Sequence, residues 1–128
     1  MRHLFIINPA AGKENRTIEL KGQIARLMQG RGEPCEIYVT KGPRDATEKI
    51  LSAARECGRI VTCEEHNVIG GLGEAVCSLL SEKHPVPVRR VGVNDEFGHS
   101  GPAAELLKEF GLSADHVAEA ALSLVRNR

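Results

Sequence analysis

Residues 64–76, EEHNVIGGLGEAV, combine two carboxylates and a histidine with three glycines that precede an apolar helical pattern. Backbone amides at a helix N-terminus carry partial positive charge, and glycines let a phosphate approach them closely. Gly70, Gly71 and Gly73 are therefore a candidate anion site. A purely structural turn is the favoured interpretation, because glycine suits any tight connection and Val76 stands where the dinucleotide fingerprint needs a third glycine or alanine.

The acidic and imidazole side chains that open this stretch belong to the types used in general acid–base catalysis. They end a predicted strand, where successive side chains point to opposite faces, so Glu64 and Glu65 cannot both face one substrate. We expect Glu65 or His66 to fix the loop by a hydrogen bond. His99 and Ser100 lack a patterned third member of a triad, and the sequence predicts no catalytic residue.

A second loop with a glycine and a lysine, NPAAGK at residues 8–13, follows the first predicted strand. It departs from the Walker motif, because Ile7 replaces the leading glycine and Glu14 replaces the serine or threonine that holds magnesium. We expect Lys13 to be a solvated loop lysine, with contact of Gly12 and Lys13 with an anion as the alternative.

The composition of the 128 residues limits the classes of partner. Basic and acidic residues both number 17, so no net charge attracts nucleic acid or an anionic membrane. No apolar run reaches the length of a membrane span, and we expect a soluble, cytoplasmic protein. The four cysteines have no C-x-x-C pair and no histidine at metal-ligand spacing, which predicts reduced, mostly buried thiols and no metal site.

Strand-like and helix-like patterns alternate along the chain. Apolar runs predict strands at 3–8, 34–40, 59–63 and 86–93, and apolar stripes or capping signals predict helices at 17–29, 46–57, 72–82, 102–110 and from 114 onward. Alternation of this kind predicts parallel pairing with right-handed crossovers. We therefore predict an α/β fold: one domain over residues 1–128, a three-layer α/β/α sandwich on a four-stranded parallel sheet of order 2-1-3-4, a Rossmann-like or flavodoxin-like half. The loops after the first and third strands would meet at the crevice where such sheets bind ligands.

Two early segments, HLFIINPAAGKENR and IYVTKGPRDAT, resemble the N-terminal part of the diacylglycerol kinase family of lipid kinases. The resemblance covers residues 1 to about 47 and implies that Asn8 and Thr40 lie near a nucleotide. The family's Gly-Gly-Asp-Gly-Thr loop, which cradles the nucleotide phosphates, and its second domain have no counterpart in the chain.

From about residue 50 to residue 128, the segments GRIVTCEEHNVIGGLGEAVCSLL, VPVRRVGVNDEFGHSG and AAELLKEFGLSADHV resemble the C-terminal domain of transketolases. In that family thiamine diphosphate and its activating residues belong to the two preceding domains, while this third domain supports dimer packing. The resemblance implies no cofactor in this segment and self-association through a surface inherited from the transketolase dimer. It also implies that residues 64–76 form a turn for packing and helix entry.

The two resemblances together predict a chimera of a lipid-kinase-like segment, 1–47, and a transketolase C-terminal-like segment, 48–128, joined within the second helix. We expect an engineered or fused α/β domain with no catalytic activity and no cofactor of its own. One alternative is a transketolase-related C-terminal subunit that needs a partner. The other is a small nucleotide- or phosphate-binding module, which could also take adventitious phosphate or sulfate, at a crevice formed by Asn8, Gly12, Lys13, Thr40, Gly70, Gly71 and Gly73.

Overall fold

The computed structural model describes residues 3–7, 17–32, 34–42, 44–94 and 100–126. The chain falls into two compact units, Met1–Ala53 and Ala54–Arg128. The boundary lies within helix α2, Ala46–Cys57.

The first unit is built on a parallel pair of short strands. β1, His3–Ile7, and β2, Cys35–Val39, pair residue by residue along their whole length, and α1, Thr17–Arg31, contacts β2. Ile7, Met28 and Leu51 are its buried apolar side chains. The sequence predicts an apolar stripe of Leu20, Ile24, Leu27 and Met28 on α1; the prediction is partly wrong, because Leu27 is 47% exposed although Met28 is 5% exposed.

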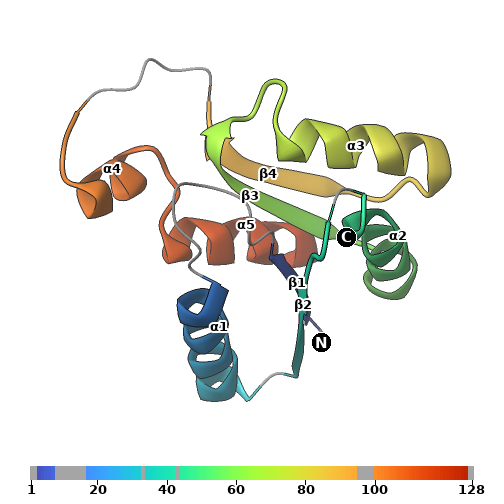
Figure 1. The fold of residues 1–128 in the computed structure, drawn as a ribbon, viewed down its shortest axis with the longest axis horizontal. Coiled ribbons are helices and arrows are strands. Elements are labelled where there is room, and N and C mark those ends of the chain that lie inside the picture. Colours follow the sequence, from blue (N-terminus) through green and yellow to red (C-terminus); the bar gives the residue numbers. More distant parts are fainter. Residues whose placement is uncertain (1–2, 8–16, 33, 43, 95–99, 127–128) are drawn as a thin grey trace. The chain divides into compact units, whose positions relative to one another are not determined.

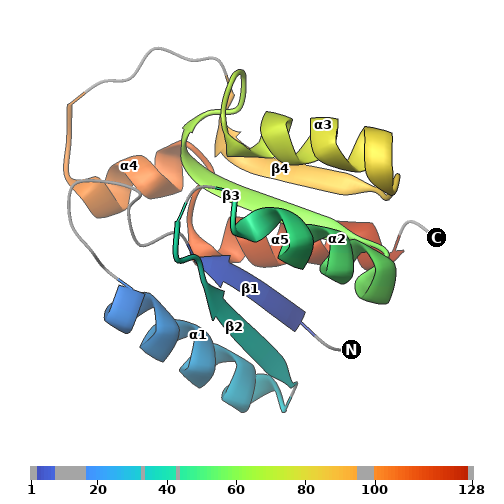
Figure 2. The ribbon, with the colours of Figure 1, turned by 45° about the vertical axis from the view of Figure 1, so that its right-hand side comes forward.

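The second unit has helices on both sides of another parallel pair. β3, Ile60–Asn67, and β4, Val88–Val93, are covered by α3, Leu72–Lys83, and α5, Ala114–Arg126, which lie on opposite faces of the pair (Figures 1 and 2). The short helix α4, Ala103–Glu109, follows Pro102.

The core of this second unit lies under α3. The sequence predicts one apolar face of Leu72, Ala75, Val76, Leu79 and Leu80. Val76 and Leu80 face inward, and Leu80 is 1% exposed, whereas Leu72 is 51% exposed. Val68 and Val91 are also buried apolar side chains of this unit. Burying a side chain such as Leu80 contributes roughly 1.5–3 kcal/mol, so this contact holds α3 firmly over the strands.

The observed pairing confirms the α/β class with parallel strands, and it contains two of the three predicted strand neighbours. The described strands form two separate two-stranded sheets, β1-β2 and β3-β4. The single four-stranded sheet of order 2-1-3-4 is therefore not confirmed, because it also needs β1 beside β3. β3 runs to Asn67, four residues beyond the predicted end, because an irregularity after Cys63 lets Asn67 pair with Val93.

The sequence also makes predictions about membrane-spanning segments and about the burial of the cysteines. None of the helices in the described residues is long and apolar enough to cross a membrane. The expectation of mostly buried thiols is wrong, because Cys63 is exposed and Cys35, Cys57 and Cys77 are half-buried.

Candidate functional site

The turn between β3 and α3 holds the acid that best explains the glycine-rich sequence. The Glu64 carboxylate, carried near the end of β3, accepts hydrogen bonds from the Leu72 amide at 2.7 Å and the Gly73 amide at 3.0 Å. These amides belong to the first turn of α3, where backbone donors have no partner within the helix. Gly71 stands at the N-cap position and offers no side-chain cap, so a carboxylate from the preceding strand serves as the cap.

Two further side chains close the same turn. The Asn67 amide oxygen accepts from the Ile69 amide at 2.9 Å, and the Glu74 carboxylate accepts from the Gly70 amide. Gly70 has φ 73°, a backbone conformation that glycine adopts without strain. The turn is thus held by three side chains, and the two carboxylates accept from the Gly70, Leu72 and Gly73 amides.

The spacing of the glycines follows from the position of Glu64. A Cβ atom on Gly71 would lie 2.8 Å from Glu64 Cδ and would overlap its Oε2, and one on Gly73 would lie 2.8 Å from Thr62 Oγ1 and 2.9 Å from Arg90 Cδ. Real Cβ atoms do not approach other atoms this closely. Gly71 and Gly73 therefore make room for side chains of the sheet beneath the start of α3.

The sheet supplies a hydroxyl and a cation next to this start. Thr62 and Arg90 are register partners on β3 and β4, and Arg90 Nη1 donates to the Val68 carbonyl at 3.2 Å. Thr62 is 6% exposed, and its Oγ1 has no hydrogen-bond partner among the residues that the structure describes. The Glu64 carboxylate is thus hydrogen-bonded at the start of α3, while the buried Thr62 hydroxyl has no partner among the described residues.

The predicted site residues are only partly placed together. Gly70, Gly71 and Gly73 share one turn. Thr40 lies in the other unit, where its amide donates to the Ile7 carbonyl at 2.9 Å and extends the β1–β2 ladder. Asn8, Gly12 and Lys13 lie outside the described residues, so the crevice that would join all seven residues stays a prediction.

Sequence reasoning did not find the role of Glu64. We expected the hydrogen bond that fixes the loop to come from Glu65 or His66, and nothing is described of their side chains. The usable signal is that Gly71 leaves the helix without a serine, threonine, aspartate or asparagine cap. A residue of β3 on the face that α3 covers is then the nearest side chain that could cap the helix. Glu64 lies on the same face as Thr62 because side chains alternate along a strand.

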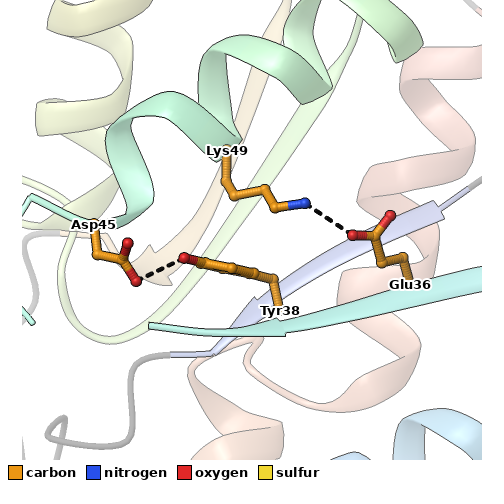
Figure 3. A network of polar contacts seen from close by, with 4 residues as sticks. All are labelled: Glu36, Tyr38, Asp45 and Lys49. Carbon is orange, nitrogen blue, oxygen red and sulfur yellow. Dashed lines mark hydrogen bonds and ion pairs between the residues drawn. The ribbon is translucent and has the colours of Figure 1, made fainter. Parts of the chain in front are cut away.

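A second polar cluster links β2 to the start of α2 within the first unit (Figure 3). The Tyr38 hydroxyl donates to Asp45 Oδ2 at 2.7 Å, and the Lys41 amide donates to the same oxygen at 2.8 Å. Lys49 Nζ lies 2.9 Å from Glu36 Oε1 and 5.1 Å from the centre of the Tyr38 ring. Asp45 thus ties β2 to the start of α2.

The titration of this cluster follows from its hydrogen bonds. The bond from Tyr38, and then the bond from the Lys41 amide, lower the pKa of Asp45 below its ordinary value of 3.8. Donating to Asp45, with burial as the second cause, raises the pKa of Tyr38 above 10.0. Both pKa shifts favour an ionised Asp45 beside a neutral Tyr38. This hydrogen-bonded pair therefore serves to stabilise the fold.

A concave region with a volume of about 250 Å³ lies at the other end of α3. It is lined by Cys77, Leu80, Ser81, Pro85, Val86 and Val88. None of the predicted site residues lines it, and its wall is mainly apolar.

Comparison with known families decides which of the two sequence resemblances holds. Residues 39–117 match the transketolase C-terminal domain, and this stretch is more than half of the chain. The chain belongs to the transketolase C-terminal domain family. The matched residues contain β3, α3, β4, α4 and the turn that Glu64 holds.

Related sequences carry names of transketolase subunits. The 6-deoxy-6-sulfo-D-fructose transketolase subunit of Clostridium sp. (strain MSTE9) is 47% identical over 99 residues, which cover 76% of this chain and 30% of that protein. An apulose-4-phosphate transketolase subunit of Phocaeicola vulgatus is 44% identical over 79 residues, 62% of this chain and 25% of that protein. The chain therefore spans less than a third of the length of these relatives.

A solved structure shows the same fold. The chain resembles a split-gene transketolase, described as an inactive β4 tetramer, with a TM-score of 0.71 and 35% identity over 98% of this chain and 39% of that one. The likeness thus extends into the first 47 residues.

These findings overturn the prediction of an engineered, inactive chimera. The relatives are named subunits of transketolases, which are enzymes, so the expectation of a non-enzyme is wrong. The lipid-kinase resemblance of residues 1–47 finds no support, because the family match begins at residue 39 and runs across the supposed junction between residues 47 and 50. The alternative of a transketolase-related C-terminal subunit is the better interpretation.

Proposed function

We propose that this chain supplies the C-terminal, assembly-forming part of a transketolase-type enzyme. The observation that carries the proposal is the use of Glu64: both of its carboxylate oxygens are bound to the start of α3. A carboxylate held in this way stabilises a helix and is badly placed to transfer a proton to or from a substrate. The names of the relatives, which are subunits, support a role within a larger enzyme.

Thiamine diphosphate is the cofactor that the transketolase family implies, and the glycine-rich turn does not fit its diphosphate. The Leu72 and Gly73 amides are bound to Glu64, and the Gly70 amide is bound to Glu74. A diphosphate would also meet the negative charges of both carboxylates. The same contacts argue against a nucleotide- or phosphate-binding module at this turn.

The same turn offers an apolar contact for another protein surface. Ile69 is 59% exposed and Leu72 is 51% exposed, although the backbone between them is fixed by Glu64, Asn67 and Glu74. Exposed apolar side chains on an ordered backbone lose little conformational entropy on binding. We assign this pair to contact with a second copy of the chain, because the similar split-gene transketolase is described as a β4 tetramer.

The proposal includes the single domain over residues 1–128 with one four-stranded parallel sheet of order 2-1-3-4. It is supported by the likeness to the split-gene transketolase over 98% of the chain. A single cooperative transition in differential scanning calorimetry is the expected result, and two resolved transitions would count against it.

Sedimentation equilibrium of three proteins tests the assembly role. Leu72→Glu places a charge in the proposed contact and should weaken self-association at least about tenfold, since one buried unpaired charge costs several kcal/mol. Ser78→Glu, an exposed change on the same helix, is the control and should leave the association constant unchanged. Equal association constants for all three proteins would show that Leu72 lies outside the interface.

A further inference from the structure

The β3–α3 turn has the properties of an anion site that is already filled. We infer that Glu64 is its ligand, and that removing this side chain opens a site for a small oxyanion of the acetate or phosphate class. The inference goes beyond the proposed assembly role and does not depend on it.

The amide geometry shows that the start of α3 binds an anion. Leu72 and Gly73 direct adjacent N–H groups at the two oxygens of one carboxylate, at 2.7 Å and 3.0 Å. α3 has 12 residues, so its aligned peptide dipoles add a partial positive charge at this end. The glycine-rich sequence that offered a candidate anion site therefore forms a cradle for a carboxylate, and its occupant is the Glu64 side chain.

A buried hydroxyl points to a ligand larger or differently shaped than the Glu64 carboxylate. Thr62 is 6% exposed and its Oγ1 has no partner among the described residues, yet it lies 2.8 Å from the position that a Cβ on Gly73 would take. A buried hydroxyl without a partner is costly. An oxyanion bound at the Leu72 and Gly73 amides, free of the tether that fixes Glu64, could also accept from Thr62.

Charge around the emptied site would favour the same ligand. The stem of Arg90 lies beside Gly73, and its guanidinium donates to the Val68 carbonyl at 3.2 Å. When Glu64 is removed, the cation and the helix dipole remain. Glu74 stays engaged with the Gly70 amide.

The natural chain should resist the same anion because Glu64 is tethered. A side chain fixed on a neighbouring strand competes at an effective concentration in the millimolar range or higher. Glu64 also packs directly against Gly71, since a Cβ added to Gly71 would overlap Glu64 Oε2. A free oxyanion must displace Glu64 before it can bind.

The test compares the natural chain with Glu64→Ala and Glu64→Gln. Each protein is titrated with sodium phosphate, sodium acetate and, at matched ionic strength, sodium chloride, while the Leu72 and Gly73 amide resonances and the thermal midpoint are followed. Glu64→Ala should show saturable shifts of both amides and a rising midpoint with phosphate or acetate. The natural chain and Glu64→Gln, whose side chain still fills the site, should bind at least about tenfold more weakly.

The outcomes separate the possibilities. Saturation of Glu64→Ala by phosphate alone identifies a tetrahedral oxyanion site, and saturation by acetate as well identifies a general oxyanion site; either supports the inference. If Glu64→Ala folds and its two amides respond to phosphate and acetate no more than to chloride, the inference is wrong. If Glu64→Ala is unfolded in chloride, recovery of the fold in phosphate or acetate supports it, and failure to recover in both contradicts it.

Discussion

Glu64 is the residue on which the interpretation of the glycine-rich segment turns. By its position before a Gly-Gly-x-Gly turn it could be a general base, a metal ligand or a helix cap. The structure selects the third role, because both carboxylate oxygens accept backbone amides of α3. Bonds from neutral amides to a carboxylate are stronger than bonds between neutral groups, so a single acid can replace the missing cap.

Replacing Glu64 by glutamine tests this role through stability. Glu64→Gln keeps one acceptor oxygen but removes the charge and puts an NH₂ group against an amide donor. The loss of a helix cap costs about 0.5–2 kcal/mol, and urea denaturation should show a decrease in this range. Glu82→Gln, at an exposed site on the same helix, should change stability little, and equal effects of the two substitutions would remove Glu64 from the cap.

The pair of Tyr38 and Asp45 predicts a pH dependence with a definite sign. The pKa of Asp45 is lowered in the folded chain, so its contribution to stability is full above 3.8 and is lost as pH falls through the lowered value. The pKa of Tyr38 is raised, so its contribution is full below 10.0 and is lost as pH rises through the raised value. Tyr38→Phe should flatten the stability profile at both ends, as measured by urea midpoints across pH.

The opposite result of this titration is easily recognised. Both ends of the profile would remain as steep in Tyr38→Phe as in the natural chain. Other carboxylates of the chain would then account for the loss of stability at low pH. The contact between Tyr38 and Asp45 in Figure 3 would make no measurable contribution to the pH dependence of stability.

At the scale of elements, the β3–α3 connection shows how glycines and an acid specify one turn. Gly70 supplies the positive φ, and Gly71 and Gly73 leave space for Glu64, Thr62 and Arg90. Each of the three glycines is therefore required for a different structural reason. The connection is ordered by contacts with the sheet, and α3 begins at a fixed place.

Two glycine-to-alanine changes should have opposite signs. Gly71→Ala should lower the free energy of unfolding by about 1–3 kcal/mol, because its Cβ would collide with Glu64. Gly30→Ala, inside α1 with no atom within 4 Å of its added Cβ, should raise it by up to about 1 kcal/mol. Chemical denaturation measures both, and a stabilising Gly71→Ala would contradict the placement of Glu64.

A double substitution checks the cause of the Gly71 effect. In a Glu64→Ala background, Gly71→Ala should cost less than it does in the natural chain, leaving mainly the 2.9 Å approach to the Asn67 carbonyl. Strictly additive effects would mean that the two residues do not meet.

The elements themselves were largely predictable from sequence. α3 and its inward residues Val76 and Leu80 follow from helical spacing, and the end of α1 near Gly32 follows from the glycines there. The extension of β3 to Asn67 was not predictable, because EEHN is polar and its pairing depends on an irregular register with β4. The cap by Glu64 was also hidden, since it joins residues eight and nine positions apart across a turn.

At the scale of the molecule, the two-parent interpretation failed for a physical reason. The segments NPAAGK and TKGPRDAT are short, and loops with glycine, proline and a helix-capping acid follow parallel strands in many α/β proteins. Such segments report local turns, and they do not distinguish families. The longer match over residues 39–117 does, and it crosses the supposed junction.

The central claim is that this chain acts through assembly, with the acid of its glycine-rich turn used to build the fold. The most direct test is the solution mass of the natural chain, measured by light scattering over a wide range of protein concentration. The account predicts a mass that rises with concentration toward a multiple of the 13.9 kDa monomer. A mass of one monomer at every concentration would contradict it.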